Sequence, residues 1–268
     1  MIKKSVLITG AGRGLGKAVA NAYHACGFQV IVTDFDPRLL DDYSGKKGYF
    51  PLQMDVSVET EVEKCARQTE QLFGKLDLLI SNAGVMDFYP VSEAGAEKLK
   101  KIFDVNVFGL ANLTKYFLPL LVKSQGRLIV ISSESFKVPS PFQPYSVSKQ
   151  ALEKLYGSIR LEFMAKGIKT ILIRPGAIQT LIMEKTFHLK GLENESVFKD
   201  EFDHFRLSIV KYIRKISTPE QVSKIILKAG TAKRPRRIYN INHNLLVTLL
   251  SHLPGKLKEK LIIKSLKG

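Results

Sequence analysis

The sequence predicts an α/β fold in which helices cover both faces of one doubly wound parallel sheet. Short apolar runs alternate with helical patterns along most of the 268 residues, and this alternation is typical of such folds. The first run, 5–8, leads through a glycine-rich turn into a helical pattern, and the second run is followed by the acid Asp34. A hydrophobic content of 45% over this length is enough for one core, so we expect a single domain.

Seven apolar runs are expected to form the sheet. Continuous apolar runs indicate strands that are buried on both faces, as in a parallel sheet. The crossover connections of such a sheet are right-handed. The expected strands are 5–8, 28–33, 48–54, 75–81, 126–133, 168–173 and 236–242, and the expected helices include 17–26, one that ends near 73, 94–122 and 145–166.

The turn after the first strand has the composition of a phosphate-binding loop. Four glycines at alternate positions follow the strand: Gly10, Gly12, Gly14 and Gly16. Glycines there let backbone N–H groups approach a pyrophosphate, and the following helix adds its positive N-terminal end. Asp34 lies 24 residues after Gly10, where a carboxylate binds the hydroxyl groups of an adenosine ribose. Strand, glycines, helix, strand and acid in this order predict a Rossmann-type dinucleotide site. A structural turn without a ligand is the weaker interpretation.

Other polar or turn-forming residues follow later strands. In a parallel sheet, ligands bind beyond the carboxyl ends of the strands. Taken singly, each of the four polar or turn-forming segments named below is typical of an ordinary turn. Beside a nucleotide turn, they are expected to line the same site. The segments are Asp55-Val56, Asn82-Ala83-Gly84, Ser132-Ser133 and Pro175-Gly176.

Tyr145 and Lys149 are the residues that could move a proton. Their spacing of four places them on one face of a helix. An ammonium near a phenol favours phenolate and lowers its pKa from about 10 toward neutrality. Such a pair alone is common on solvated helices, but Ser133 precedes it at a strand end. Asn106 lies in a helical pattern with apolar neighbours, which predicts a buried amide that binds a water or a backbone carbonyl.

These motifs together resemble the short-chain dehydrogenase/reductase family over residues 3 to 242, nearest to its steroid and retinol dehydrogenase branch. One departure is Ser81, where the family often has a further asparagine. The motifs are Thr9-Gly10-x-x-x-Gly14-x-Gly16, Asn82-Ala83-Gly84, Asn106, Ser133, Tyr145-x-x-x-Lys149 and Pro175-Gly176.

The resemblance implies a role for each residue. Tyr145 would be the general acid/base, and Lys149 would lower its pKa and hold the nicotinamide ribose. Ser133 would orient the substrate oxygen, with Ser132 as the alternative, and Asn106 would anchor a proton-relay water. Asp55 and Val56 would flank the adenine, Asn82 would line the cofactor channel, and Gly176, Ile178 and Thr180 would hold the nicotinamide side. The implied cofactor-binding residues are Gly10, Arg13, Gly14, Leu15, Gly16, Asp34, Asp55, Val56, Asn82, Ala83, Gly84, Tyr145, Lys149, Pro175, Gly176, Ile178 and Thr180.

The cofactor is expected to be NAD, with NADP as the alternative. A carboxylate such as Asp34 accepts hydrogen bonds from ribose hydroxyls and repels a 2′-phosphate. Arg13 argues the other way, because a basic residue before Gly14 is a feature of NADP-using relatives.

Residues 180–217 correspond to the segment that covers the substrate in the family. Their aromatic content indicates a secondary alcohol or ketone on a hydrophobic molecule such as a steroid, retinoid or lipid. A helix pair packed on the domain is the alternative, and the two are compatible. The apolar side chains are Met183, Phe187, Phe198, Phe202 and Phe205. Rival functions are an NADPH-dependent 3-oxoacyl-thioester reductase and a dinucleotide-sensing or membrane-docking protein without turnover.

The chain ends in a basic amphipathic segment. We divide it into a dinucleotide-binding catalytic domain, 1–242, and a C-terminal helical extension, 243–268. Nine Lys and Arg against one acid in 231–268 supply half of the net charge of +16. The leucines of 244–266 recur at helical spacing, and Pro254-Gly255 divides them into two short helices. The extension could contact an anionic membrane, cover the substrate cleft or pack on another subunit.

Composition limits the other classes of function. The two cysteines and five scattered histidines lack the spacing of metal ligands, so we expect no metal site. No aromatic-interleaved basic motif indicates nucleic-acid binding. Without a long apolar N-terminal stretch, the expected location is the cytoplasm, with membrane association on its cytoplasmic face as an open alternative. The family resemblance implies a homo-dimer or homo-tetramer built on the helices that contain Asn106 and Tyr145.

Overall fold

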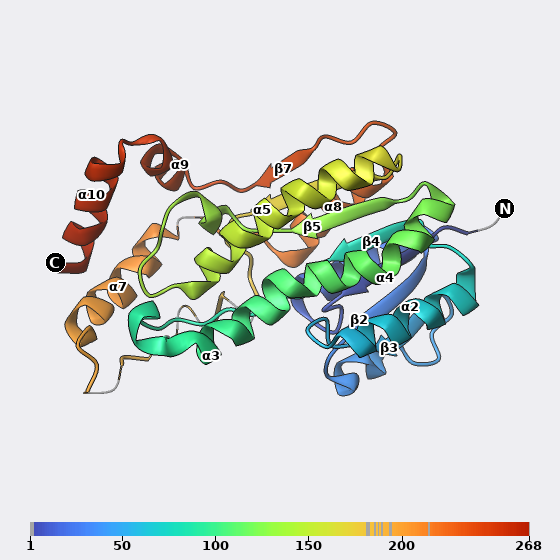
Figure 1. The fold of residues 1–268 in the computed structure, drawn as a ribbon, viewed down its shortest axis with the longest axis horizontal. Helices are drawn as coiled ribbons and strands as arrows, with labels where there is room; N and C mark the ends of the chain where they lie inside the picture. Colours follow the sequence, from blue (N-terminus) through green and yellow to red (C-terminus); the bar gives the residue numbers. More distant parts are fainter. Residues whose placement is uncertain are drawn as a thin grey trace.

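The computed structural model contains one seven-stranded parallel sheet, as the sequence predicts. It describes the chain except residues 1–2, 181–182, 185, 187, 189, 193–194, 214 and 268, and the side chains of 210–212. The strand order is β3-β2-β1-β4-β5-β6-β7 (Figure 1). The strands are β1 Ser5–Thr9, β2 Gln29–Asp34, β3 Tyr49–Gln53, β4 Leu78–Ser81, β5 Arg127–Ile131, β6 Lys169–Pro175 and β7 Ile238–Ile241. This order reverses beside β1, where a doubly wound sheet binds its ligand.

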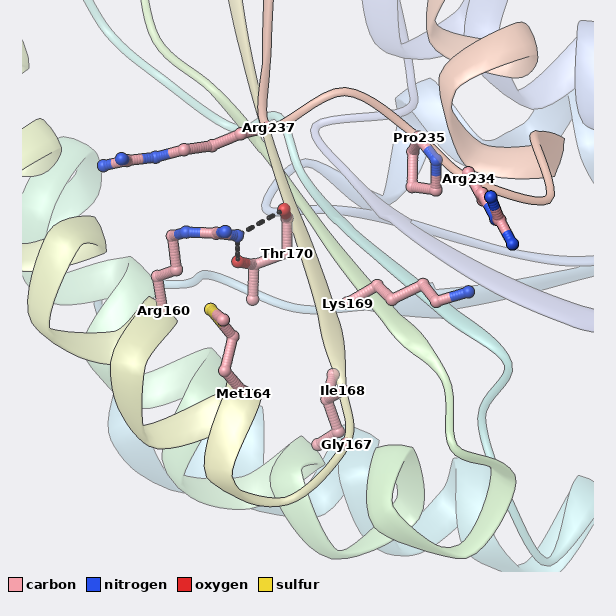
Figure 2. A pocket seen from close by; sticks show the side chains of 9 residues that line it. All are labelled: Arg160, Met164, Gly167, Ile168, Lys169, Thr170, Arg234, Pro235 and Arg237. Carbon is pink, nitrogen blue, oxygen red and sulfur yellow. Dashed lines mark hydrogen bonds between the residues drawn. The ribbon is translucent and has the colours of Figure 1, made fainter.

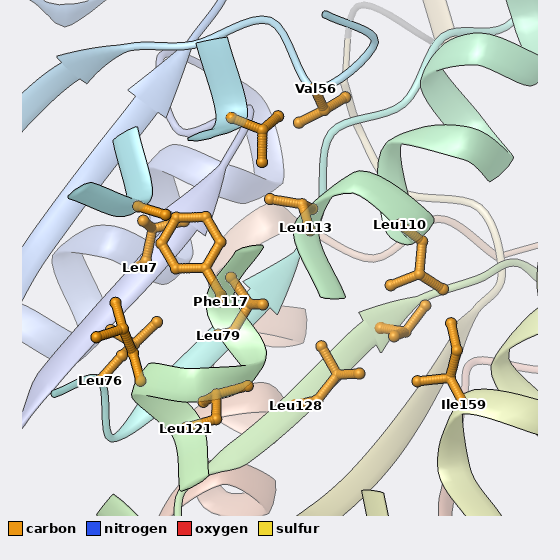
Figure 3. Packing of buried hydrophobic residues seen from close by; sticks show 14 of the residues in the cluster. Leu7, Val56, Leu76, Leu79, Leu110, Leu113, Phe117, Leu121, Leu128 and Ile159 are labelled. Atoms are coloured by element: carbon orange, nitrogen blue, oxygen red, sulfur yellow. The ribbon is translucent and has the colours of Figure 1, made fainter. Parts of the chain in front are cut away.

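Helices cover both faces of the sheet, because successive strand residues point to opposite sides. On one face α1 Gly14–Ala25 packs beside α8 Pro219–Thr231. On the other lie α2 Glu59–Phe73, α4 Gly109–Ser124 and α5 Pro144–Ala165. Figure 3 shows this second core, where Phe117 and Leu121 of α4 lie among strand leucines such as Leu7 and Leu128. Burial on both faces explains why the strands are apolar throughout.

The helix expected at 94–122 is interrupted in the structure. It consists of α3 Val91–Phe103, one π-helical turn, η2 Asp104–Phe108, and α4. Gly95 also departs from helical geometry, with φ +66°. The extra residue of a π-turn changes which side chain faces inward, and here Asn106 is buried.

The run Val91–Ser124 is long and apolar enough, by length and composition, to cross a membrane. Half of its most apolar window is buried. Since Phe117 and Leu121 belong to the core in Figure 3, we assign this run to the packed interior of the domain.

The remaining helices gather near the carboxyl ends of the strands. Figure 1 places α7 Lys199–Tyr212, α9 Leu245–His252 and α10 Gly255–Lys267 at one end of the molecule. As expected, two short helices flank Pro254, and α10 packs against α7. Short helical turns, η1 Pro37–Tyr43 and η3 Glu134–Lys137, complete the described elements. A small apolar cluster lies under α7 and includes Phe88, Phe142, Phe202, Phe205 and, partly buried, Phe198 and Leu266.

Much of the aromatic segment at 180–217 therefore packs on the domain. Phe202 and Phe205 are buried, while Met183 and Phe198 are partly exposed. Phe187 lies outside the described residues. The cluster joins the covering segment to the C-terminal extension through Leu266.

Candidate active site

The glycine-rich turn between β1 and α1 is shaped so that side chains are excluded. Gly10 and Gly14 have φ +63° and +53°, in the left-handed region that favours glycine. A Cβ at Gly16 would overlap the Gly10 carbonyl oxygen. A Cβ at Gly14 would lie 3.4 Å from Cγ2 of Thr180. Thr180 is distant in sequence but lies against the turn, as a shared dinucleotide site requires.

Thr9 and Asn82 fix the position of this turn. The Asn82 side-chain amide donates to the carbonyl oxygens of Thr9 at 2.9 Å and Gly10 at 3.2 Å. The Thr9 hydroxyl accepts from the backbone N–H groups of Asn82 and Ala83, at 3.0 and 2.9 Å. Asn82 therefore braces the turn, and its role includes more than lining the cofactor channel. Thr9 was not among the predicted site residues, although it opens the glycine motif.

Asp34 lies at the end of β2, directly beside the turn. Its side chain is 4% exposed, and its Oδ2 accepts from the Gly12 N–H at 3.1 Å. A Cβ at Gly12 would lie 2.9 Å from this oxygen, so a glycine is needed there. Arg13 is exposed at the same edge, and Leu15 is buried in the α1 core. For Leu15, only the backbone is placed to contact a cofactor.

The expected adenine side is formed by Asp55 and Val56 after β3. Asp55 Oδ1 accepts from the N–H and hydroxyl of Ser57, at 2.8 and 2.6 Å. Val56 is buried, and its carbonyl accepts from the Asn112 side chain at 3.0 Å. A Cβ at Gly109 would lie 2.8 Å from Val56 Cγ2. This wall is therefore rigid and tightly packed against α4.

Pro175 and Gly176 begin the segment on the expected nicotinamide side. The Gly176 N–H donates to the Ile241 carbonyl at 2.8 Å, and Ile178 forms an isolated bridge with Ser217. From there the chain reaches Thr180, beside Gly14. The segment therefore runs from the end of β6 back to the glycine-rich turn.

Asn106 connects two loops of the site from inside the π-turn. Its Oδ1 accepts from the Val85 N–H at 2.9 Å, and its Nδ2 donates to the Val85 carbonyl at 2.9 Å. The same Nδ2 donates to the Ser148 hydroxyl at 2.9 Å, which donates to the Tyr145 carbonyl at 2.7 Å. The predicted contact with a backbone carbonyl is confirmed. The proton-relay water stays a prediction.

Ser133, Tyr145 and Lys149 lie together at the carboxyl end of the sheet. The Ser133 hydroxyl lies near the Tyr145 phenol and favours its ionised form. It also accepts from the Ser135 N–H at 3.2 Å and from the Ser135 hydroxyl at 3.0 Å. Lys149 Nζ lies 5.5 Å from the centre of the Tyr145 ring and donates to the Ile131 carbonyl at 3.0 Å. A Cβ at Gly84 would lie 3.8 Å from that Nζ. A side chain at position 84 would therefore approach both Lys149 and Asn106, whose Oδ1 would lie 3.3 Å from the same Cβ.

The choice between the two serines follows from a partly buried ion pair that the sequence did not reveal. The Ser132 hydroxyl donates to Glu153 Oε1 at 2.7 Å. Arg174 donates two hydrogen bonds to the same carboxylate, at 2.9 and 2.6 Å. Ser132 is thus held behind the site, whereas Ser133 faces Tyr145. Glu153 lies one helical turn beyond Lys149, so 145, 149 and 153 share one face of α5, a spacing that could have indicated it.

Burial is the largest influence on the pKa values of Tyr145 and Lys149. It raises the pKa of Tyr145 to about 12, and the nearby Ser133 hydroxyl opposes this rise. It lowers the pKa of Lys149 to about 8, and the negative charge of Glu153 opposes this fall. The structure therefore differs from the expectation that Lys149 brings the phenol pKa toward neutrality. The reason is that desolvation of the phenol is the larger effect, while the ammonium is directed to the Ile131 carbonyl.

A separate pocket lies at the opposite end of the sheet. Figure 2 shows Arg160, Lys169 and Arg237 around a cavity of about 380 Å³, with Arg160 bonded to Thr170. Lys169 begins β6, whereas Ser133 and Tyr145 follow the carboxyl end of β5. This pocket is thus distinct from the site that contains Tyr145.

The residues present fit a dinucleotide. Positive-φ glycines form a cradle with no room for side chains, Asp34 lies at its edge, and Thr180 lies across from it. The turn and the helix N-terminus would hold the pyrophosphate, Asp34 the adenosine ribose, and Lys149 the nicotinamide ribose. The Ser133–Tyr145 pair would then face the nicotinamide side, where a substrate oxygen needs a proton donor or acceptor.

Known proteins resemble this chain in sequence and in fold. A reductase from Ornithobacterium rhinotracheale, named NADPH-dependent 3-dehydrocapnine reductase, is 29% identical over 97% of this chain and 96% of its own. 11-beta-hydroxysteroid dehydrogenase A of Sesamum indicum is 28% identical over 84% of this chain and 66% of its own. A crystal structure of a short-chain dehydrogenase from Streptomyces avermitilis aligns with a TM-score of 0.80 at 26% identity, over 97% of this chain and 94% of that one.

For several other curated relatives, the matched part is 58 to 64% of their length. The family model described as short chain dehydrogenase matches residues 4–190, which include the glycine-rich turn, Asn106, Ser133, Tyr145 and Lys149. The chain therefore belongs to the short-chain dehydrogenase family, whose members are NAD(P)-dependent oxidoreductases of small-molecule alcohols and ketones.

Proposed function

We propose that this enzyme interconverts a secondary alcohol and a ketone on a hydrophobic molecule. The observation that carries the proposal is the group formed by Ser133, Tyr145 and Lys149 beside the dinucleotide cradle. When bound, NAD(P) supplies the hydride donor or acceptor. Ser133 holds the substrate oxygen, and the Tyr145 hydroxyl gives it a proton in reduction or takes one in oxidation. Lys149 stabilises the phenolate that forms after the proton leaves.

A hydrophobic substrate is supported by the covering segment. Phe198 and Met86 are partly buried beside the phenylalanine cluster, so apolar atoms remain accessible at its edge. The name of the Sesamum indicum relative also supports a steroid-like substrate. Reduction with NADPH is the second candidate, because the relative that matches nearly the whole chain is named as an NADPH-dependent reductase.

NAD is the cofactor that Asp34 favours. A carboxylate that is almost fully buried and directed at the turn would repel a 2′-phosphate. Arg13 is exposed at the same edge, and its charge would attract that phosphate. We expect the buried acid to prevail, since solvent screens an exposed charge more strongly.

Hydride transfer should therefore be measured with NAD and NADP against sterols, retinoids, fatty alcohols and β-hydroxyacyl thioesters. The expected result is NAD-linked oxidation of a lipophilic alcohol, with kcat/KM at least about tenfold higher than with NADP. Asp34→Asn keeps the shape and removes the charge, so it should reduce this preference. Higher kcat/KM with NADP in the unaltered enzyme would contradict the assignment. Tight dinucleotide binding without turnover on any substrate would favour the sensing role.

A homo-oligomer built on α4 and α5 is part of the proposal. Large apolar side chains are exposed here, with Leu161 at 70% and Met164 at 52% on α5, Val122 at 36% on α4, and Phe108 at 50% in η2 just before α4. Exposed apolar residues on neighbouring helices are typical of subunit interfaces. Light scattering should give a dimer or tetramer mass, and Leu161→Glu with Met164→Glu should lower it. A monomer mass for the unaltered protein would contradict this interface.

A further inference from the structure

The two C-terminal helices expose an apolar surface that their own packing does not use. Six large aliphatic side chains of α9 and α10 point to solvent, and Leu245 and Leu249 are 76% and 68% exposed. Isolated exposed leucines are ordinary, but several on two consecutive short helices indicate an interaction surface. Five of them form what we call the C-terminal surface, and Ile263 lies on another side of α10. The five are Leu245, Leu246, Leu249, Leu257 and Leu261.

The opposite sides of the same helices hold them on the domain. Leu266 packs against the phenylalanine cluster, and α10 packs on α7. At the start of α9 the Asn244 N–H donates to Glu134 Oε2 at 2.8 Å, and Lys137 Nζ donates to the Thr248 hydroxyl at 2.8 Å. The helices are therefore fixed by their inner residues, and the C-terminal surface is left facing outward.

The charges of α9 and α10 themselves are almost all positive. Lys256, Lys260, Lys264 and Lys267 of α10 are exposed, and Glu259 is the one acid of the extension. Lysines beside exposed leucines are the composition of helices that lie in the interface of an anionic bilayer, with leucines among the acyl chains and lysines at the headgroups.

We propose that the C-terminal surface binds the face of an anionic phospholipid bilayer. Charge complementarity selects this occupant. A second copy of the chain would bring the same lysines into contact and repel them, whereas anionic headgroups attract them. The inner leaflet of the plasma membrane carries such lipids, and the two free thiols, Cys26 and Cys65, agree with a reducing compartment.

The position of the C-terminal surface gives membrane binding a role in substrate delivery. This role rests on the proposed function. Because α10 packs on α7, a bilayer bound there would lie beside the segment that covers the substrate. A lipophilic alcohol or ketone would then reach the enzyme from the membrane instead of from water.

Co-sedimentation of the purified full-length enzyme with lipid vesicles tests the proposal. We expect binding to vesicles that contain about one third phosphatidylglycerol, and at least about tenfold weaker binding to phosphatidylcholine alone. Binding should also fall as sodium chloride rises from about 0.05 to 0.5 M, because the lysines are exposed and screened. No sedimentation with the anionic vesicles would overturn the proposal, even if the enzyme turns over its substrate.

Matched variants separate a specific surface from the general effect of a basic protein. Lys256→Glu with Lys260→Glu should weaken binding at least about tenfold. Arg234→Glu with Arg236→Glu changes the net charge equally at the far end of the sheet, and should retain most binding. Leu245→Ser with Leu249→Ser should also weaken binding, whereas Leu72→Ser on α2 should not. Dinucleotide affinity should be the same in all of them, which shows that they fold.

Two results would contradict the inference. Equal losses of vesicle binding in the double lysine variant and the double arginine variant would show that the membrane attracts the protein by its net charge alone. A lower mass of the leucine variant in light scattering, without lipid, would instead assign the C-terminal surface to a contact between copies of the chain. Loss of turnover with vesicle binding intact would affect only the proposed function, so the two hypotheses fail separately.

Discussion

Replacing Tyr145 with phenylalanine is expected to reduce kcat by about a thousandfold or more while dinucleotide binding changes little. The substitution removes one oxygen, the phenol that lies near Ser133 and that the proposed mechanism uses as the proton donor and acceptor. The ring remains to fill the same space, and the glycine cradle is untouched. Without the phenol, the substrate oxygen has no group to exchange a proton with as hydride moves.

The measurement pairs steady-state turnover with dinucleotide titration followed by intrinsic tyrosine fluorescence or calorimetry. Ser133→Ala and Ser132→Ala provide a matched comparison, since the two serines are neighbours but only Ser133 faces Tyr145. We expect the larger loss of kcat for Ser133→Ala. Turnover that survives in the Tyr145→Phe enzyme would remove Tyr145 from the proposed mechanism.

The sheet could be predicted because its signals are local and repeated. Each strand is a continuous apolar run, and a parallel strand that is buried on both faces requires such a run. The glycines of the turn are equally predictable, because backbone geometry at Gly10 and Gly14 and close packing at Gly16 admit no side chain. Strand ends were less certain, and β4 begins at Leu78, three residues after its expected start.

The features that the sequence could not give depend on contacts between distant residues. The π-turn around Asn106 has no periodic signature, because a single extra residue shifts the helical phase without changing composition. Glu153 looks like any acid on an amphipathic helix until Arg174, from a strand, and Ser132, from a loop, are seen beside it. The same ion pair decides which of two adjacent serines faces the site.

Burial of Lys149 has a consequence for stability. The side chain is 4% exposed, and its pKa lies at about 8 instead of 10.5 because burial disfavours the ammonium. Between these pH values the unfolded chain binds more protons than the folded one, so stability rises with pH across this window. Below pH 8 the full penalty is present, which corresponds to about 3 kcal/mol for this fall in pKa.

Lys149→Met is therefore expected to stabilise the cofactor-free protein while nearly abolishing turnover. At pH 7 the free energy of unfolding should rise by about 2 kcal/mol, because the buried charge is lost and only one hydrogen bond, to the Ile131 carbonyl, is given up. The rise in stability between pH 8 and 10.5 should disappear with it. Urea unfolding across this pH range measures both the stability at pH 7 and its change with pH. Lys64→Met on the exposed side of α2 is the control, because it removes a solvated lysine.

A Lys149→Met protein that is less stable than its parent at pH 7 would contradict this expectation. It would mean that the contacts of the ammonium stabilise the fold by more than its desolvation destabilises it. An increase in stability would show a conflict between stability and activity in this one side chain, since the proposed mechanism uses its positive charge beside the Tyr145 phenolate.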